Sequence, residues 1–515
     1  MIETSKVKLS SRAAGGAAFL KRESYMLEAR SCIVVAVAAT ALASGCRSAP
    51  GYTDRDVDIT EADMRARIGF LAADQLEGRG TPSTGLELAA SYIRSEFARM
   101  GLQAPPGGYV QRYRLAMTEM GADWSLALSR GNRRALLALG TDYWGLPWAA
   151  GTVEGDLRFV DAVGRPGMRE TGEPTIWVAR LSAAVLPREW LAEAADAGAA
   201  GLLLVLTAET EALMSHWLEV GETLYELGDV EPSLPAALVT ESALAAALER
   251  LGLEATTTAG APAGSGVRAR LAADLRAETL AAPNVMGIVR GSDPELAEEF
   301  VLLSAHMDGL GVGPPVDGDS IYNGADDNAS GTSALLEVAE AVAALERRPK
   351  RSIFFLAVSG EERGLLGSSW FVEHPPIRLD RVIANINIDM VGRNWEDTIA
   401  VIGKPYSTLG AIVDSVAAAH PELSMTPVGD RWPQENFFFR SDHFNFAREG
   451  IPAVFFFNGV HEDYHMPSDE ADKIKNGKAA RVSRLIFEVA VALANAEQPP
   501  GWDDAARARI VEDGR

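Results

Sequence analysis

Short apolar strands followed closely by acidic or imidazole side chains recur in the second half of this sequence. Residues 301–303 and 353–358 are apolar, β-branched or aromatic runs, which is typical of buried strands in a parallel sheet. Between them, residues 332–344 keep apolar side chains at helical spacing, so the order is strand, loop, helix, strand. The carboxyl ends of such strands share one edge, and ligands bind in the crevice beyond it. The side chains expected at that edge are those of His306, Asp308, Asp327, Glu361 and Glu362.

Two pairs among these residues favour a metal site. His306 and Asp308 form an H-x-D pattern at a strand end, where alternate side chains point to the same face. Asp308 is therefore placed to hold one ring nitrogen of His306 while the other nitrogen binds a metal. Glu361 and Glu362 are adjacent, and burying two neighbouring carboxylates costs several kcal/mol unless a cation compensates for their charge. A lone histidine or a solvated Glu-Glu turn requires no metal, so the inference rests on the combination.

Two later strands supply further candidate ligands. Asp389 follows the apolar run 382–388, and His465 follows the run 451–457, within the segment HEDYHMPSD. Carboxylates combined with imidazoles suit zinc or a similar divalent ion. Five protein ligands are too many for one open tetrahedral site, so the sequence favours a pair of metal ions bridged by one carboxylate.

Several short motifs follow one another in the order of a known family. They are HMD, GADDNASG, SGEERGLLGS, NIDMVGR, SDHFNF and DYHMPSD, and they cover most of residues 270–480. In these motifs the chain resembles the co-catalytic di-zinc aminopeptidases, a family of bacterial leucyl aminopeptidases with relatives such as glutamate carboxypeptidase, glutaminyl cyclase and the transferrin receptor. The resemblance implies an α/β fold, the zinc-exopeptidase three-layer αβα sandwich with a mostly parallel mixed central sheet.

The resemblance also implies a role for each site residue. One zinc ion would be held by His306, Asp327 and Asp389, and the other by Asp327, Glu362 and His465. Asp327 would thus bridge two Zn²⁺ ions, although other divalent metals suit the same ligands. Glu361 would be the general base and Asp308 the partner of His306. Family members often have a cis peptide bond after the bridging carboxylate, here between Asp327 and Asn328.

Composition limits the class of partner. The chain has 515 residues, 47% hydrophobic and 23% charged, which is ordinary for a globular protein large enough for two domains. Its formal net charge is −23, so nucleic acid is disfavoured as a partner, because phosphate binding needs a basic face. An acidic surround modestly favours a cationic substrate group, such as the free α-amine of a peptide.

The first residues predict export rather than a folded element. An apolar run from Cys32 to Ala43 follows Arg30 and is shorter than the about 20 residues that span a bilayer. Residues 1–45 are therefore predicted to be a signal peptide, with Met26 as a possible start. The ending LASGC resembles a bacterial lipoprotein cleavage site, which would make Cys46 a lipid anchor in the cell envelope, facing the periplasm or the exterior; plain secretion is the alternative. Cleavage would leave one cysteine, so no disulfide within the chain is expected.

The remaining sequence divides by composition into a linker, two domains and a tail. Residues 46–58 are a polar linker, and 59–126 with 271–497 are assigned to the peptidase domain. Residues 127–270 alternate Ala-rich helices with short strands and resemble the protease-associated domain inserted in such peptidases. Residues 498–515 are expected to be a polar tail that frays.

The sequence predicts a metal-dependent exopeptidase that removes the N-terminal residue of peptides. Tyr464 and Arg393 are candidates for contacting the substrate, and the resemblance implies that residues 437–446 border its cleft. A carboxypeptidase on the same site is the nearest alternative, because Arg393, Arg431 and Arg440 are available to bind a terminal carboxylate. A glutaminyl cyclase and a non-catalytic binding protein are less favoured, since no expected metal ligand is missing. Side-chain preference and oligomeric state do not follow from the sequence.

Overall fold

The structure is a computed structural model that describes residues 59–160, 173–181, 187–207, 210–211, 223–229, 232–253 and 266–512. The predictions of a signal peptide, a start at Met26, a lipid anchor at Cys46 and a linker at 46–58 lie outside the described residues. Among the helices within the described ranges, none combines the length and the apolar character needed to cross a membrane.

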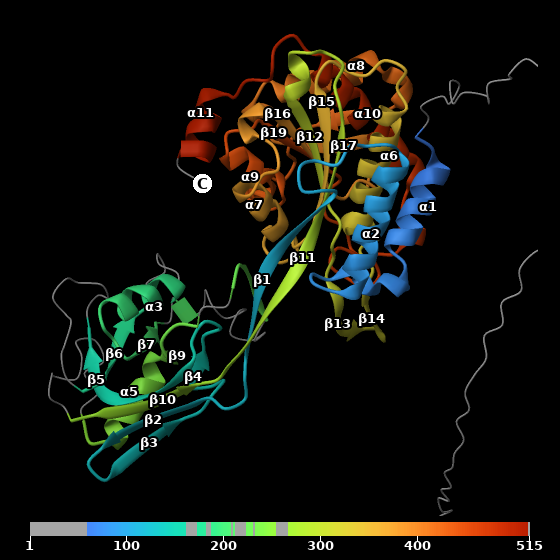
Figure 1. The fold of residues 1–515 in the computed structure, drawn as a ribbon. Coiled ribbons are helices and arrows are strands. Elements are labelled where there is room, and N and C mark those ends of the chain that lie inside the picture. The colour runs from blue at the N-terminus through green and yellow to red at the C-terminus, as the bar shows by residue number, and fades with distance from the viewer. Residues whose placement is uncertain are drawn as a thin grey trace, which may run out of the picture. The chain divides into compact units, whose positions relative to one another are not determined.

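The sheet that carries the candidate ligands has nine strands in the order β18-β17-β19-β16-β12-β15-β11-β1-β8 (Figure 1). Its centre is parallel and consists of β19 (Ala453–Phe457), β16 (Val382–Ile388), β12 (Phe300–His306) and β15 (Ser352–Val358). Beyond β15 the neighbouring strands alternate in direction: β11 (Leu275–Val289), β1 (Val110–Met120) and β8 (Leu224–Leu227). At the other edge β17 (Thr398–Ile402) is antiparallel to β19, and β18 (Thr426–Val428) is parallel to β17. The four central strands therefore present their carboxyl ends on one edge.

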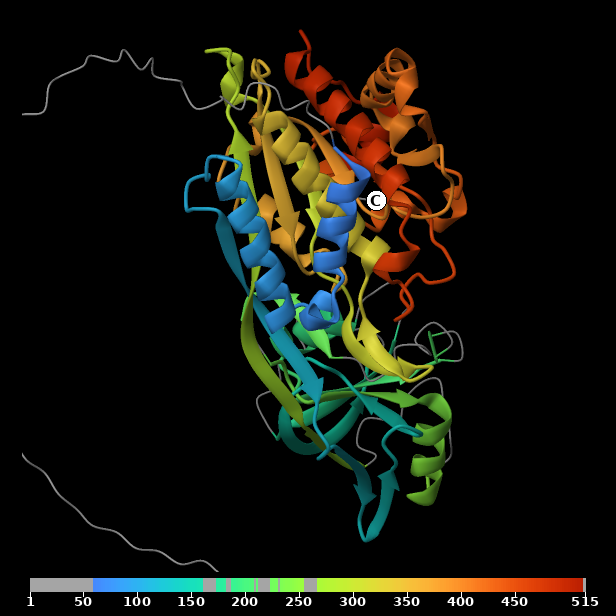
Figure 2. The same cartoon turned by 90° about the vertical axis from the view of Figure 1, so that its right-hand side faces the viewer.

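One face of this sheet is covered by helices that include α1 (Glu61–Leu71), α2 (Thr84–Arg99), α6 (Gly331–Ala343) and α10 (Asn476–Asn495) (Figure 2). Val301, Leu303 and Ala305 of β12 face this layer, because side chains of a strand alternate between its two faces. Thr60 caps α1 by accepting a hydrogen bond from the backbone N–H of Asp63, as the TEAD sequence predicts. Helix α8 (Leu409–Ala419) packs against α10 and lies beside β18.

The opposite face is covered by α7 (Leu366–Glu373) and α9 (His443–Arg448). Here the alternate residues Phe300 and Leu302 of β12 pack with Phe371 of α7 and Phe446 of α9. Helices thus cover both faces of a mixed sheet, which confirms the predicted αβα sandwich.

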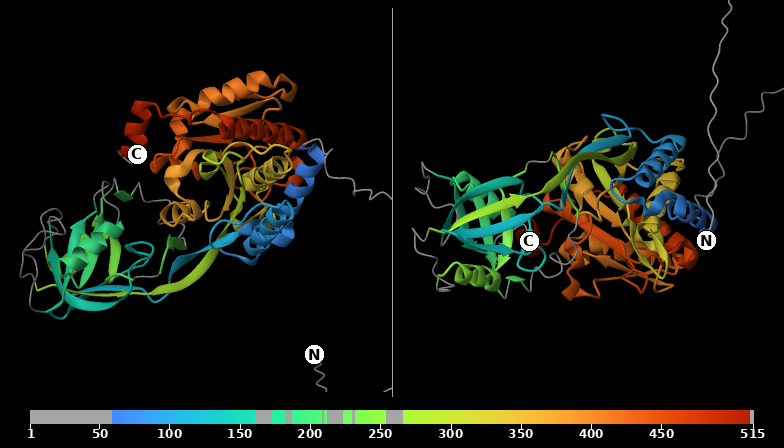
Figure 3. Two further views of the ribbon diagram at one scale, coloured as in Figure 1. Left: turned by 45° about the horizontal axis from the view of Figure 1, so that its top comes forward. Right: turned by 90° about the horizontal axis from the view of Figure 1, so that it is seen from below.

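A second sheet has its own core and eight strands in the order β3-β2-β10-β5-β6-β7-β9-β4. These strands are the teal to light green arrows of Figure 3: β2 (Ser125–Arg130), β3 (Arg133–Leu137), β4 (Tyr143–Gly145), β5 (Gly151–Phe159), β6 (Thr175–Arg180), β7 (Gly201–Leu206), β9 (Ala236–Thr240) and β10 (Arg268–Ala273). Helices α3 (Pro187–Asp196) and α5 (Glu241–Arg250) contribute to its core. Its kinship with the protease-associated domain stays a prediction. A separate hairpin, β13 (Gly311–Val316) and β14 (Asp319–Tyr322), follows β12.

The prediction of a fraying polar tail is wrong for residues 501–512. Trp502 donates its indole N–H to the carbonyl oxygen of Gly450 at 2.8 Å. Helix α11 (Asp504–Arg507) and the turn that follows it bury Ala506 and Ile510 against Phe455 and Phe457. Three apolar side chains among charged ones are enough to attach this segment, although its average composition is polar.

Candidate metal centre

All five predicted metal ligands lie at the carboxyl edge of the parallel strands. His306 is the last residue of β12, and Asp389 directly follows β16. Glu362 lies in the turn after β15, Asp327 in the loop before α6, and His465 in the loop after β19. The first two positions are fixed by the sheet, whereas the other three depend on loops.

The nitrogen and oxygen atoms of these side chains converge in two groups. In the first group, His306 Nε2 lies 3.3 Å from Asp327 Oδ1 and 3.2 Å from Asp389 Oδ1. In the second group, His465 Nε2 lies 3.3 Å from Asp327 Oδ2 and 3.4 Å from Glu362 Oε2. Each oxygen of Asp327 therefore faces a different imidazole. Both groups bring three potential ligand atoms close enough to hold one ion.

The spacing of these atoms fits metal binding. Two ligands about 2.0 Å from a tetrahedral zinc ion lie about 3.3 Å apart, close to the distances in both groups. Among the described residues, neither ring nitrogen of His306 has a hydrogen-bond partner and Asp389 Oδ1 has none, although all three atoms are buried. Burial raises the pKa of Asp389 and of Glu362, because the charged carboxylates lose their hydration. A divalent cation would compensate both deficits, so the residues present fit the predicted metal.

The shared carboxylate differs from its neighbours. Burial acts to raise the pKa of Asp327, but His306 and His465 outweigh it and hold that pKa below its usual range. Burial acts to lower the pKa of His465, but Asp327 and Glu362 outweigh it and raise that pKa to about 10. The Asp327 carboxylate thus has two cationic partners, His306 and His465. Two metal ions bound here would compensate its charge in their place.

Asp308 is held beside His306 by a residue from the N-terminal part of the chain. Asp308 Oδ1 lies 3.7 Å from His306 Nδ1 and accepts a hydrogen bond from the backbone N–H of Glu361 at 3.3 Å. Its other oxygen accepts a hydrogen bond from the Thr81 hydroxyl at 2.9 Å, and the Thr81 oxygen accepts one from the N–H of Gly360 at 3.1 Å. Thr81 thus connects the H-x-D pair to the turn that carries Glu361.

Arg79 is a second residue of that N-terminal segment that the sequence reasoning did not assign to the site. Its guanidinium is buried and donates to four backbone carbonyl oxygens, those of Leu71, Met307, Asn323 and Gly324. Burial lowers the pKa of Arg79 to about 10, although nearby carboxylates, Asp308 foremost, act to raise it. The segment LEGRG was the only sequence signal for this role.

A cavity next to the first group has an apolar wall. Met390, Phe437, Phe455 and Phe457 line it, beside Asp327, Glu361, Asp389 and His465. Tyr464 lines the same cavity and stacks on the His465 ring at 3.8 Å between centroids. Burial raises the pKa of Glu361 well above its usual range.

Of the three arginines proposed to bind a terminal carboxylate, only Arg440 lines this cavity. Arg393 is instead paired with Asp463 at 2.7 Å, with its side chain 11% exposed. Arg431 lies over the ring of Trp395. Of residues 437–446, which were predicted to border the substrate cleft, Phe437, Arg440 and Ser441 line this cavity.

Asp389 is oriented by a chain of hydrogen bonds across the sheet. Ser441 donates its hydroxyl to Asp389 Oδ2 at 2.9 Å and accepts a hydrogen bond from Asn387 Nδ2 at 2.8 Å. This interaction occupies Oδ2 and leaves Oδ1 facing His306.

The peptide bond between Asp327 and Asn328 is cis, as the resemblance implied.

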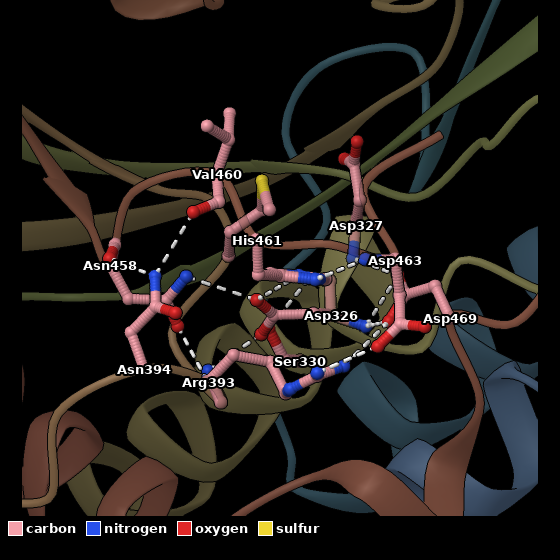
Figure 4. Close-up of polar contacts among 12 residues, drawn as sticks. Asp326, Asp327, Ser330, Arg393, Asn394, Asn458, Val460, His461, Asp463 and Asp469 are labelled. Carbon is pink, nitrogen blue, oxygen red and sulfur yellow. Dashed lines mark hydrogen bonds and ion pairs between the residues drawn. The ribbon is translucent and has the colours of Figure 1, made fainter. Parts of the chain in front are cut away.

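Behind the second group lies a buried polar network that the sequence reasoning also missed (Figure 4). Its principal members are Asp326, His461 and Asp469, and none of them was singled out by a strand end or a motif role. Asp326 and Asp469 carry their carboxylates in the interior, and the side chain of His461 is 4% exposed.

Comparison with known proteins relates part of the chain to a family. Residues 284–490 match the profile of Peptidase family M28. Aminopeptidase YwaD of Bacillus subtilis is 29% identical over 230 residues, 42% of this chain and 46% of that protein. A probable leucine aminopeptidase of Arthroderma otae is 27% identical over 226 residues, 41% of this chain and 58% of that protein. The chain thus matches about half the length of these curated relatives.

A solved structure extends the likeness to most of the described fold. The aminopeptidase from Aneurinibacillus sp. strain AM-1 is 21% identical, with a TM-score of 0.52 over 85% of this chain and 94% of that one. At this identity the likeness concerns the fold. Residues 284–490 match Peptidase family M28, which confirms the resemblance predicted from the motifs.

Proposed function

We propose that this protein is a metal-dependent exopeptidase that removes the N-terminal residue of peptides and works with two zinc ions. One ion would be held by His306, Asp327 and Asp389, and the other by Asp327, Glu362 and His465. The observation that carries the proposal is the Asp327 carboxylate, whose two oxygens each face one imidazole at 3.3 Å. A carboxylate between two such groups is suited to bridge two ions.

When bound, the zinc pair would polarise the scissile carbonyl and lower the pKa of an attacking water. Glu361 is the proposed general base, because it lines the cavity beside Asp327 and Asp389. It would take the proton of the water and return it to the leaving amine. The hydrogen bond from its backbone N–H to Asp308 fixes the turn on which Glu361 stands.

The substrate is proposed to be a peptide with a free N-terminus. The acidic residues around the cavity favour the cationic α-amine, and Met390 with the three phenylalanines would accommodate an apolar first side chain. Arg440 keeps a carboxypeptidase as a second candidate, because it lines the cavity and is 45% exposed. A bacterial envelope location with a lipid anchor at Cys46 remains part of the proposal.

The test uses the purified protein with aminoacyl p-nitroanilides in free and N-acetylated forms, and with peptides whose C-terminus is free or amidated. Cleavage of the free-amine compounds alone, abolished by a chelator and restored by zinc, is the expected result. Removal of C-terminal residues from free but not amidated peptides would replace the proposal with a carboxypeptidase. If zinc-loaded protein cleaves no peptide, neither exopeptidase assignment stands.

A further inference from the structure

Two loops that carry ligands of the second group hold each other through buried carboxylates. The Asp327 loop, residues 324–330, precedes α6, and the His465 loop, residues 458–469, follows β19. Figure 4 shows their polar contacts, in which each loop supplies an aspartate that accepts hydrogen bonds from the other. These aspartates are Asp469 and Asp326, which are 1% and 0% exposed.

Asp469 binds the backbone on which the shared carboxylate stands. Its Oδ2 accepts hydrogen bonds from the N–H of Asp326 at 3.0 Å and of Asp327 at 3.1 Å, and its Oδ1 lies 3.1 Å from the same Asp326 nitrogen. The backbone carbonyl of Asp469 also accepts from the N–H of Ala325 at 3.0 Å. Three consecutive N–H groups of the Asp327 loop therefore depend on one residue of the His465 loop.

Asp326 makes the reciprocal connection. Its Oδ2 accepts from Asn458 Nδ2 at 3.0 Å and lies 3.2 Å from His461 Nε2. His461 Nδ1 accepts a hydrogen bond from the backbone N–H of Asp463 at 3.3 Å, so the ring proton stands on Nε2 and is donated to Asp326. Asp326 Oδ1 accepts hydrogen bonds from the Ser330 hydroxyl and from the backbone N–H of Gly392.

These contacts bear unequally on the two groups of metal ligands. His306 and Asp389 stand at the ends of β12 and β16, which pair directly in the centre of the sheet. His465 stands on a loop, with its side chain 40% exposed and a positive φ of 58°. The contacts described above connect the loop of His465 directly to the loop of Asp327, and Asp469 is four residues away from His465 in the chain.

We infer that Asp469 is a positioning residue that sets the geometry of the second metal position, formed by Asp327, Glu362 and His465, while the first position is held mainly by the sheet. The inference rests on the proposed di-zinc site. It assigns to Asp469 no contact with substrate or metal. Its effect passes through the backbone N–H groups of Asp326 and Asp327.

The test measures zinc stoichiometry and affinity of the full chain by competition with a chromophoric chelator. Asp469→Ala is expected to bind one zinc ion with an affinity near that of the wild type and the second about 10- to 100-fold more weakly. Asp469→Asn keeps an oxygen that is able to accept both N–H groups, so its second affinity should fall between those of Asp469→Ala and the wild type. The visible absorption of the Co²⁺-loaded proteins should change for the second ion added and not for the first.

Asp463→Asn is the matched control, because Asp463 lies on the same loop and is similarly buried. Its carboxylate binds Arg393, Ser468 and Lys473, all outside the Asp327 loop. The control should retain both affinities, and thermal unfolding of the metal-free proteins gives the general destabilisation of each variant.

Two results would overturn the inference alone: wild-type affinity for both ions in Asp469→Ala, or an equal loss of the second ion in Asp463→Asn. Parallel loss of both ions in Asp469→Ala would likewise exclude selective positioning. A wild-type protein that binds fewer than two zinc ions would overturn the proposed di-zinc function, and this inference with it.

Discussion

Thr81 donates its hydroxyl hydrogen to Asp308 Oδ2 at 2.9 Å, across a separation of 227 residues in the chain. Through the same oxygen it accepts the N–H of Gly360, at the start of the turn that carries Glu361. A segment that precedes the second sheet in the chain thus contacts two parts of the candidate metal centre that follow that sheet, Asp308 and the turn that carries Glu361. The contact connects this segment to the sheet that carries the candidate ligands.

Replacing Thr81 with valine should lower activity without removing a ligand. The substitution keeps the side-chain shape but leaves a buried carboxylate oxygen and a buried N–H without their partner, at a cost of about 1–3 kcal/mol in stability. Because Asp308 and the Glu361 turn would both move, we expect kcat to fall roughly 10-fold. Steady-state kinetics and urea unfolding measure the two effects. Thr81→Ser keeps the hydroxyl and should restore most of both; equal defects in the two variants would contradict the explanation.

Glu361→Gln tests the division of roles between the adjacent glutamates. A glutamine has nearly the same shape but cannot accept the proton, so kcat should fall by about 10²- to 10⁴-fold while the zinc content stays at the wild-type level. Glu362→Gln should instead lose zinc, because its carboxylate belongs to the second group of ligands. Elemental analysis of both variants separates the cases. If Glu361→Gln loses its zinc, the assignment of Glu361 as a base rather than a ligand is wrong.

Removing the metal should destabilise the protein. The buried carboxylates of Asp389 and Glu362 have raised pKa values without an ion, since burial penalises their charge. Each zinc ion present at about 1,000 times its dissociation constant stabilises the folded state by about 4 kcal/mol. The unfolding temperature should therefore fall on chelation and recover with zinc, and calorimetry measures this. Glu361→Gln is the control and should respond like the wild type; an unfolding temperature that chelation leaves unchanged would show that no metal is bound.

The convergence of the candidate ligands could be predicted because their signal is local. His306 and Asp389 stand at the ends of apolar strands, and the rule that parallel strands end on one edge brings them together without knowledge of any other contact. The same rule placed Asp327 and His465 near this edge although they stand on loops, and the motif order then suggested their roles. The same local reasoning identified α1 from its threonine cap.

The residues that orient the ligands could not be predicted in this way. Asp469 binds backbone N–H groups more than 140 residues away in the chain. The segment MPSD, in which it lies, has the composition typical of a solvated turn. Arg79 binds backbone carbonyl oxygens, so its role could not be predicted from an acidic partner in the sequence. The prediction of a fraying C-terminal tail was wrong for a related reason. Trp502 and Ile510 are two apolar residues in a polar segment, and their packing partners come together only in the folded sheet.

A final prediction concerns His443, which is buried between the rings of Phe438 and Phe455. Burial lowers the pKa of His443 to about 3, so the imidazole is neutral in the folded protein at any ordinary pH. In the unfolded chain its pKa is about 6.5, and below that pH unfolding takes up a proton. The stability that a neutral His443 supplies is therefore complete above pH 6.5 and is lost as the pH falls towards 3, by roughly 1.4 kcal/mol per pH unit.

His443→Phe removes this titration while keeping an aromatic ring among aromatic neighbours. Between pH 7 and pH 5 the free energy of unfolding of the wild type should fall by about 2 kcal/mol more than that of the variant. Urea unfolding of the two proteins without metal measures this difference, since metal release then plays no part. Asp442, whose pKa burial raises to about 7, is common to both proteins and cancels in the comparison. Parallel pH profiles would mean that His443 is protonated in the folded protein or reaches water, because only a neutral buried imidazole couples unfolding to proton uptake in this range.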